Sequence, residues 1–237
     1  KAYHRYPFLL NNDTPKRLVK DTVLASTASG QAKLSFTEPL LIYSRRDLNG
    51  MLIERAARAG ADVEKDRVLD AERTGSGWRI RTKARTIEAD HCVVATGARN
   101  PLRHTGTQWR PEDTSCALGY FIPGDHDHVD IQFFPELEGY IWLFPRQGHL
   151  SAGIGGKGAS SQVLRAKLER YLDEKGLPYK GEQFFGHMLP ALEQASWQKN
   201  RVAGDGWLAA GDAAGLVDPV TGEGIYYAMR SADIAAD

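Results

Sequence analysis

One stretch of the sequence, GDAAGLVDPVTGEGIYYAM from Gly211 to Met229, constrains the fold more than any other. It follows a short apolar run and places many turn-forming residues where a strand is expected to meet a helix. A strand ending at Gly211 and Asp212 would present a carboxylate at the carboxyl edge of a sheet, where open α/β sheets bind ligands. A carboxylate there can accept hydrogen bonds from sugar-like hydroxyls. The stretch therefore predicts a site for a dinucleotide cofactor.

The second half of this stretch predicts a helix of small residues between Gly222 and Asp237. Gly222, Gly224 and the start of this helix offer backbone N–H groups and the positive end of a helix dipole. Such a helix end favours a group that gains negative charge, as the pyrimidine edge of a flavin does on reduction. Pro219 would stiffen the turn between the two parts. The alternative is an ordinary strand–loop–helix junction in which Asp212 only caps a turn.

Composition excludes several other classes of protein. The 237 residues, 42 % of them apolar, can form one large or two small domains with a sizeable core. Thirty basic residues balance thirty acidic ones, so neither nucleic acid nor an anionic membrane is expected as the main partner. Two cysteines, Cys92 and Cys116, are too few for a disulfide framework or an iron–sulfur cluster within this segment. With no secretory signal and no long apolar run, a cytoplasmic location is expected.

Periodicity along the chain predicts a mixed α/β architecture with two interleaved domains. The β-rich runs between residues 18 and 43, separated by Gly30 and Pro39, predict antiparallel strands. A helix face follows from Leu48 to Ala59 and ends at Gly60. Residues 117–155 alternate strand patterns with turns and predict an antiparallel sheet. A further helix is expected from Ser160 or Ser161 to about Lys175.

The string GDAAGLVDPVTGEGI resembles the second FAD-contacting motif of the geranylgeranyl-reductase-like flavoproteins, which share the para-hydroxybenzoate-hydroxylase fold. The resemblance implies that Asp212 bonds to the ribityl chain of FAD and that the turn from Gly222 to Ile225 lies beside the isoalloxazine. The cofactor-binding residues that it implies in this string are Gly211, Asp212, Pro219, Gly222, Glu223, Gly224 and Ile225.

The segment SRRDLNGMLIERAARAGADV is similar to the Arg-x-x-Phe-Asp-x-x-Leu helix start of the same family. By this match Arg45 is the position that approaches the cofactor, although Leu48 and Asn49 stand where Phe and Asp are usual. An arginine before a helix can also pair with a pyrophosphate or a flavin edge on physical grounds. The alternative is a solvated arginine, with Arg46 as an equal candidate.

Two further segments resemble motifs of the family. CVVATGARNPLR is similar to its Ala-Thr-Gly strand end, which implies that Thr96 and Gly97 pass close to the adenosine half of the cofactor. GYIWLFPRQGHLSAGIG resembles its Tyr-x-Trp-x-Phe-Pro motif. Tyr140, Trp142 and Phe144 alternate, so they share one side of a strand and can line an apolar substrate cavity. The alternative for these rings is the core side of a sheet.

The family's N-terminal Gly-x-Gly-x-x-Gly turn and its Cys-Gly-Gly loop are both absent from this sequence. The first of them should hold the FAD pyrophosphate at a helix N-terminus. We therefore expect the chain to be a fragment that binds FAD poorly by itself. The expected FAD-binding domain is Rossmann-like, incomplete at its N-terminus, and covers residues 41–105 and 200–237. An antiparallel-sheet substrate domain would cover residues 1–40 and 106–199.

His126 and His128 lie in GDHDHVD together with Asp125, Asp127 and Asp130. These residue types are compatible with a metal site. A polar turn between strands is the interpretation that the sequence favours, so no metal is expected. His91, His104, His149 and His187 are scattered and indicate nothing specific.

The leading functional hypothesis is an FAD-dependent reductase of carbon–carbon double bonds in a hydrophobic, isoprenoid-like substrate. The sequence specifies neither catalytic residues nor the electron donor, and peripheral membrane contact by the intact enzyme stays open.

The first alternative is an aromatic monooxygenase or halogenase of the same fold. Hydroxylases usually have His where this chain has Gly215, and halogenases share Trp-x-Trp-x-Ile-Pro where this chain has YIWLFP. The second alternative is a flavin-free fragment without activity.

Overall fold

The computed structural model describes residues 2–100 and 109–237, and these form two compact units. Of these residues, unit 1 comprises Ala2 and those within Glu64–Ser115 and Met188–Asp237, and unit 2 comprises Tyr3–Val63 and Cys116–His187. His104, the end of CVVATGARNPLR and the expected boundary at residue 105 lie outside the described residues. Both units are therefore assembled from separate stretches of chain. The assignment of cofactor binding to one domain and substrate binding to the other stays a prediction.

A seven-stranded sheet of order β11-β7-β10-β9-β8-β1-β2 dominates unit 2. Its strands are β1 (Lys16–Ser26), β2 (Gly30–Tyr43), β7 (Thr114–Ile122), β8 (His128–Phe133), β9 (Glu138–Arg146), β10 (His149–Lys157) and β11 (Gln183–Pro190). Strands β7, β10, β9 and β8 pair antiparallel in turn, as the sequence predicts for residues 117–155. Strand β8 then pairs in parallel with β1, which forms an antiparallel hairpin with β2.

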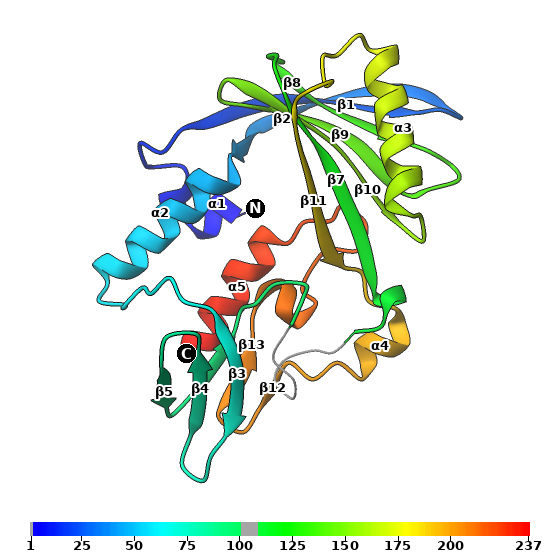
Figure 1. Cartoon of the computed structure of the whole chain (residues 1–237). Coiled ribbons are helices and arrows are strands. Elements are labelled where there is room, and N and C mark those ends of the chain that lie inside the picture. The colour runs from blue at the N-terminus through cyan, green and yellow to red at the C-terminus, as the bar shows by residue number, and fades with distance from the viewer. Residues whose placement is uncertain (1, 101–108) are drawn as a thin grey trace. The chain divides into compact units, whose positions relative to one another are not determined.

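Helix α3 (Ser161–Glu174) packs on one face of this sheet (Figure 1). The Ser160 side chain accepts a hydrogen bond from the backbone N–H of Val163, which is the usual N-cap arrangement. The helix then ends at Lys175, so the predicted helix is confirmed. The buried core between helix and sheet consists of Leu118, Tyr120, Ile122, Ile141, Leu143, Leu150, Ala152, Ile154, Leu164, Leu168, Tyr171, Leu172 and Tyr179.

The expectation that Pro39 separates two strands is wrong, because β2 continues through it. Pairing with β1 runs from Tyr43 to Leu40 and resumes at Ser35 after a register shift. Proline lacks an N–H group and is tolerated at irregularities of edge strands, and β2 is the edge strand of this sheet. Unit 2 also contains α1 (Ala2–Arg5) except for its first residue, the 3₁₀ turn η1 (Pro7–Leu9) and α2 (Arg45–Arg58), which is followed by Gly60 at a positive φ of 96°.

Unit 1 contains two three-stranded sheets. One is an antiparallel meander of β3 (Val68–Arg73), β4 (Trp78–Thr82) and β5 (Thr86–Ala89). The other has the order β12-β13-β6 and consists of β12 (Ala203–Gly204), β13 (Trp207–Ala209) and β6 (Cys92–Val94). The remaining elements are η2 (Pro111–Asp113), α4 (Gln194–Gln198), η3 (Gly211–Ala214) and α5 (Ile225–Ala236). Its buried core is Ala71, Trp78, Cys92, Val94, Ala209, Ala213 and Ala214.

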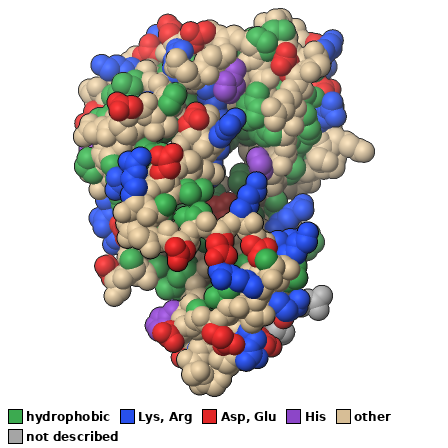
Figure 2. Space-filling view, turned by 60° about the vertical axis from the view of Figure 1, so that its left-hand side comes forward, with side chains coloured by type: hydrophobic (Ala, Val, Ile, Leu, Met, Phe, Trp, Pro, Cys, Tyr) green, Lys and Arg blue, Asp and Glu red, His purple; other side chains and the backbone are tan. Residues whose placement is uncertain are grey.

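Charged side chains of both signs are interspersed on the face shown in Figure 2. This distribution agrees with the formal net charge of zero. Both cysteines are free, with Cys92 buried and Cys116 half-buried. No helix among the described residues is long and apolar enough to cross a membrane.

Candidate functional site

Two predicted cofactor segments leave the same edge of a sheet in unit 1. Strand β13 pairs in parallel with β6, and Ala209 lies opposite Val94. The backbone N–H of Ala210 donates a further bond of 3.0 Å to the carbonyl of Val94. Parallel strands have their carboxyl ends on one side, so Thr96-Gly97 and Gly211-Asp212 both follow strands at that side. This is the edge at which open α/β sheets bind ligands.

Gly211 and Gly215 enclose a short 3₁₀ turn that carries Asp212. Both glycines have left-handed backbone conformations, with φ of 58° and 73°. A Cβ at Gly211 would lie 3.0 Å from Cβ of Ala228 in helix α5, so only glycine fits against this helix without displacement. The backbone N–H of Gly211 donates to the hydroxyl of Ser231 in the same helix, at 2.9 Å. The strand end and helix α5 are thereby held together.

The loop between η3 and α5 is ordered by Asp218. Its carboxylate accepts hydrogen bonds from the backbone N–H of Val220 at 3.1 Å and of Thr221 at 2.8 Å. Its backbone N–H donates to the carbonyl of Glu223, and its carbonyl accepts from the N–H of Gly222, both at 2.9 Å. This arrangement closes the turn around Pro219 and leads the chain into helix α5. The loop geometry therefore comes from local hydrogen bonds.

Helix α5 begins at Ile225, three residues after the predicted start at Gly222. Gly222 has a φ of 70° and belongs to the loop, which explains the later start. The N-cap residue Gly224 makes no side-chain cap, and the N–H of Ala228 makes the first helical bond to its carbonyl at 2.8 Å. A Cβ at Gly224 would lie 3.0 Å from Oδ1 of Asp212, so carboxylate and helix start are adjacent. The positive end of this helix dipole therefore lies beside the strand end.

Arg45 lies in unit 2 as the first residue of helix α2, directly after the N-cap Ser44. Its charge acts on a second arginine, Arg146, at the end of β9. Burial is the main cause that lowers the pKa of Arg146, the charge of Arg45 lowers it further, and Asp47 opposes both. Nε of Arg146 is buried and has no hydrogen-bond partner among the described residues. Two guanidinium groups that act on each other in this way can hold an anionic group.

Sequence reasoning missed Arg146, although it directly follows the motif that contains Trp142 and Phe144. The signal that could have revealed it is a cation at the end of an otherwise apolar strand. Its guanidinium lies 5.5 Å from the ring centroid of Phe121, within the range of a cation–π contact.

Tyr140, Trp142 and Phe144 share the face of the sheet opposite α3. Along β9 they are half-buried, whereas the intervening Ile141 and Leu143 are buried in the core beneath α3. The ring centroids of Trp142 lie 6.2 Å from those of Tyr140 and 6.3 Å from those of Phe144. We call this side of the sheet the aromatic face. Its role in substrate binding stays a prediction.

Glycines of strand β10 lie beneath the indole of Trp142. Gly153 lies opposite Trp142 in the register of β10 and β9, and a Cβ there would lie 2.2 Å from the indole. Phe121 on β7 shares the aromatic face and stacks on Phe185 of β11 at 4.7 Å. Phe121 and Phe185 were not among the predicted substrate residues. The sequence could not reveal them, because only the strand order brings β11 beside β7 and β7 beside β10.

The opposite face of the sheet has a hollow of a different character. It lies in unit 2, has a volume of about 630 Å³, and its wall includes Lys167, Arg170, Glu136 and Glu174. Phe134 and Tyr171 also line the hollow, so a hydrophobic ligand there would lie against apolar surface and four charged side chains. The aromatic face is the better candidate for such a ligand.

The predicted site residues thus fall into two groups. Unit 1 contains Thr96, Gly97, Gly211, Asp212, Pro219, Gly222, Glu223, Gly224 and Ile225. Unit 2 contains Arg45, Tyr140, Trp142 and Phe144. Within unit 1 the structure brings together the strand end and the helix start. Within unit 2 it brings together three aromatic rings.

The sequence of this chain is similar to those of several known proteins. No protein-family model matches the chain. The digeranylgeranylglycerophospholipid reductase 2 of Methanothermobacter thermautotrophicus is 31% identical over 213 residues, which cover 83% of this chain and 54% of that protein. The digeranylgeranylglycerophospholipid reductase of Methanothrix thermoacetophila is 34% identical over 212 residues, with the same coverage of both proteins. The menaquinone reductase of Mycolicibacterium smegmatis is 31% identical over 228 residues, or 86% of this chain and 54% of that protein.

Solved structures show the same fold. A geranylgeranyl bacteriochlorophyll reductase-like protein from Thermoplasma acidophilum superposes with a TM-score of 0.77 and 24% identity, covering 93% of this chain and 61% of that one. The flavin-dependent brominase Bmp2 superposes with a TM-score of 0.74 and 17% identity, covering 99% and 65%. The predicted mixed α/β fold is therefore confirmed. The chain spans about half the length of the curated relatives that it matches.

Proposed function

We propose, from the premise that this chain is a relative of the geranylgeranyl-reductase-like oxidoreductases, that the intact protein is an FAD-dependent reductase of carbon–carbon double bonds. The observation that carries the proposal is a sequence match of 31–34% identity over 83% of the chain with two reductases of digeranylgeranyl lipids. A match of similar identity with a menaquinone reductase points the same way. Digeranylgeranyl lipids and menaquinone both contain isoprenoid chains, so we assign an isoprenoid-like, hydrophobic substrate.

The residues of unit 1 fit a flavin dinucleotide. Gly224 lacks the side chain that would crowd the carboxylate of Asp212, and Gly211 lacks the one that would push α5 away. The carboxylate of Asp212 would accept hydrogen bonds from the ribityl hydroxyls, and Thr96-Gly97 would lie along the adenosine half. The first turn of α5, with Glu223 before it and Ile225 at its start, would lie at the isoalloxazine. When bound, FAD would supply the hydride that reduces the substrate double bond.

The chain's own residues would orient the groups and exclude water. The dipole of α5 favours negative charge at its N-terminus, which matches a group that becomes anionic on reduction. The Asp218 hydrogen bonds and Pro219 hold the preceding loop in one conformation, which lowers the entropy lost on binding. Arg45 and Arg146 would attract an anionic part of the cofactor or of a lipid substrate.

The aromatic face would bind the hydrocarbon part of the substrate. Trp142, above glycines of strand β10, and Phe144 offer half-buried apolar surface, and Tyr140 extends it along β9. Apolar burial of this kind is non-directional, so it tolerates a long, flexible isoprenoid chain. A surface that collects such a chain would also be compatible with contact between the intact enzyme and a membrane.

The test is the visible absorption spectrum of the purified intact protein. We expect a flavin spectrum, with FAD released on denaturation, and a marked loss of flavin in Asp212→Asn. Asp90→Asn is the matched control, because Asp90 is an exposed aspartate of the same unit. Reduced protein mixed anaerobically with a geranylgeranyl lipid should then reoxidise, and the product should gain two hydrogen atoms per reduced bond.

Other outcomes separate the alternatives. An intact protein that stays colourless after incubation with FAD would overturn the flavin assignment. Consumption of oxygen with hydroxylation or halogenation of a phenol would instead favour a monooxygenase or a halogenase; a flavin-dependent brominase shares this fold.

A further inference from the structure

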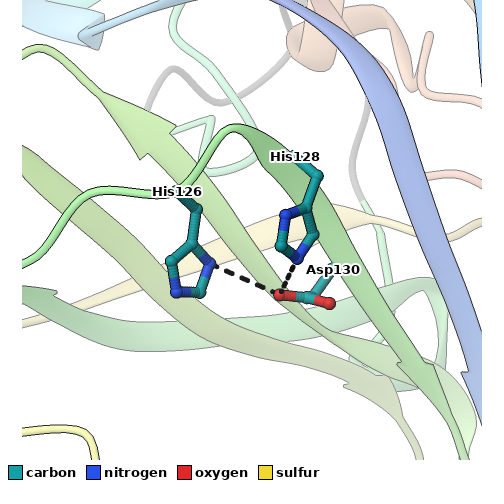
Figure 3. A group of neighbouring side chains, drawn as sticks. All are labelled: His126, His128 and Asp130. Atoms are coloured by element: carbon teal, nitrogen blue, oxygen red, sulfur yellow. Dashed lines mark ion pairs between the residues drawn. The ribbon is translucent and has the colours of Figure 1, made fainter.

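His126, His128 and Asp130 form a side-chain cluster at the start of strand β8 (Figure 3). His128 and Asp130 are two residues apart on the strand, so their side chains lie on the same face. His126 precedes the strand and turns its ring toward the same carboxylate. Nδ1 of His126 lies 3.4 Å, and Nε2 of His128 lies 3.3 Å, from Oδ2 of Asp130. The three ligand atoms all lie within 4.8 Å of one another.

We propose that this cluster is a binding site for a divalent transition-metal ion such as Zn²⁺. Two imidazole nitrogens and one carboxylate oxygen are a ligand set that such ions prefer. Ligand atoms about 2.0–2.1 Å from a tetrahedral Zn²⁺ lie about 3.3–3.4 Å apart. The observed separations of 3.4 and 3.3 Å from Oδ2 of Asp130 have this size. The site is independent of the proposed flavin function.

The hydrogen bonding of His128 supports a cation at this position. Its Nδ1 lies 2.6 Å from Oδ1 of Asp127, so the Nδ1 proton is donated to that carboxylate. In the neutral ring Nε2 then carries a lone pair and faces the lone pairs of Asp130. A metal ion placed between the two groups would accept lone pairs from both. A carboxylate that holds the second nitrogen is also the usual outer-shell partner of a metal-bound histidine.

His126 offers a second imidazole nitrogen to the same position. Its Nδ1 is buried and has no hydrogen-bond partner among the described residues. Its ring is nearly parallel to that of His128, with centroids 5.2 Å apart and planes 11° apart. One metal ion beside Oδ2 of Asp130 would give Nδ1 of His126 a partner and would also bind Nε2 of His128. Across the described chain, no lysine or arginine forms an ion pair with Asp130.

The surroundings hold the cluster in place and leave it accessible. Arg17 pairs with Asp125 at 2.7 Å and donates to the carbonyl of His126 at 3.0 Å, which anchors the turn before β8. The side chains of His126 and His128 are 27% and 31% exposed, so an ion can enter and water can fill a remaining position. Asp130 lies opposite Leu143, on the face that α3 covers and away from the aromatic face. The site is therefore suited to fixing the turn to the sheet.

The experiment measures Zn²⁺ binding to the intact, tag-free protein by calorimetry after treatment with a chelator. We expect one Zn²⁺ per chain, with affinity lowered about tenfold or more in His126→Gln, His128→Gln and Asp130→Asn. Asp127→Asn should also weaken binding, because it loses the bond to Nδ1 of His128. His91→Gln is the matched control, since His91 is an exposed histidine of unit 1, and it should bind as the parent does.

Co²⁺ provides a second readout, because a site with nitrogen ligands gives it a visible spectrum that the ligand variants should lose. If a histidine variant fails to fold, Asp130→Asn and Asp127→Asn still test the site with almost no change in shape. Equal Zn²⁺ affinity in the parent and in His128→Gln would overturn the proposal. So would absence of Zn²⁺ uptake by the parent protein.

Discussion

In unit 1, a Cβ atom on Gly224 would lie 3.0 Å from Oδ1 of Asp212. The residue that caps helix α5 is therefore in contact distance of the carboxylate that follows strand β13, although a loop separates them in sequence. Gly224 has a φ of −114°, which any residue can adopt. Glycine is therefore favoured at this position because a larger side chain would not fit beside Asp212, and not because of its backbone conformation.

Gly224→Ala should weaken FAD binding by the intact protein about tenfold, or about 1.4 kcal/mol. The added methyl group would press on Asp212 and would also lie 3.3 Å from Cγ2 of Val217. The ratio of flavin to protein absorbance after dialysis measures the effect. Gly75→Ala is the control, because no atom lies within 4 Å of a Cβ there. Equal flavin retention in both variants would contradict the idea that this contact shapes the site.

Asp113→Asn should lower the free energy of unfolding by about 2–3 kcal/mol, because Asp113 is a buried hydrogen-bond acceptor. Its carboxylate accepts from the backbone N–H of Arg110 at 3.1 Å and of Glu193 at 3.1 Å, and from the hydroxyl of Ser196 at 3.0 Å. These bonds join η2 to helix α4. Urea unfolding of the parent and of Asp113→Asn measures this loss of unfolding free energy. The exposed neighbour Glu112→Gln should change stability by less than about 0.5 kcal/mol.

The contribution of Asp113 should also depend on pH. Burial alone would raise the pKa of Asp113, but the bonds from Ser196, Arg110 and Glu193 outweigh burial and hold the pKa below its usual value. A carboxyl with a lowered pKa stabilises the folded state above its unfolded pKa of about 3.9, and the gain is lost as pH falls through the folded pKa. The stability difference between parent and Asp113→Asn should therefore shrink from about pH 6 to about pH 3. A constant difference would show that ionisation is not involved.

Local sequence signals predicted the local parts of the site. Ser160 as an N-cap, Gly60 as a helix stop and the alternation of Tyr140 with Trp142 all depend on neighbours in sequence. The helix after Gly222 was also expected, although its start moved to Ile225 because Gly222 adopts a positive φ within the loop. Propensity and periodicity are sufficient for features of this kind.

Features that depend on strand order could not be predicted in this way. Nothing in the sequence places Phe185 of β11 against Phe121 of β7, or Arg146 beside Arg45. Pro39 was misinterpreted as a strand end because its tolerance depends on β2 being an edge strand. The sequence around His126 also does not reveal the face on which Asp130 lies, because the strand register sets it.

Arg146→Met should leave the stability of the flavin-free protein unchanged or raise it slightly, while weakening FAD or lipid binding. Burial and the charge of Arg45 both disfavour the Arg146 cation, so its removal relieves a cost, and methionine keeps the packing on Phe121. Thermal unfolding measures the stability of the variant, and its flavin content measures FAD binding. Arg170→Met, an exposed arginine on α3, should change neither. A clear loss of stability in Arg146→Met would show that the guanidinium is structural.

Gly153→Ala should displace the indole of Trp142, because the new Cβ would lie 2.2 Å from its Cζ2 atom. Overpacking of this size costs about 1–3 kcal/mol of stability and forces the ring off its site. Gly155→Ala is a closely matched control on the same strand and face, since its Cβ would lie 3.7 Å from the same ring. Near-ultraviolet circular dichroism should report a changed tryptophan environment in the first variant alone. If the aromatic face binds the isoprenoid chain, the first variant should also raise KM for the lipid with less effect on flavin content. Equal KM values in the two variants would move the substrate away from this face.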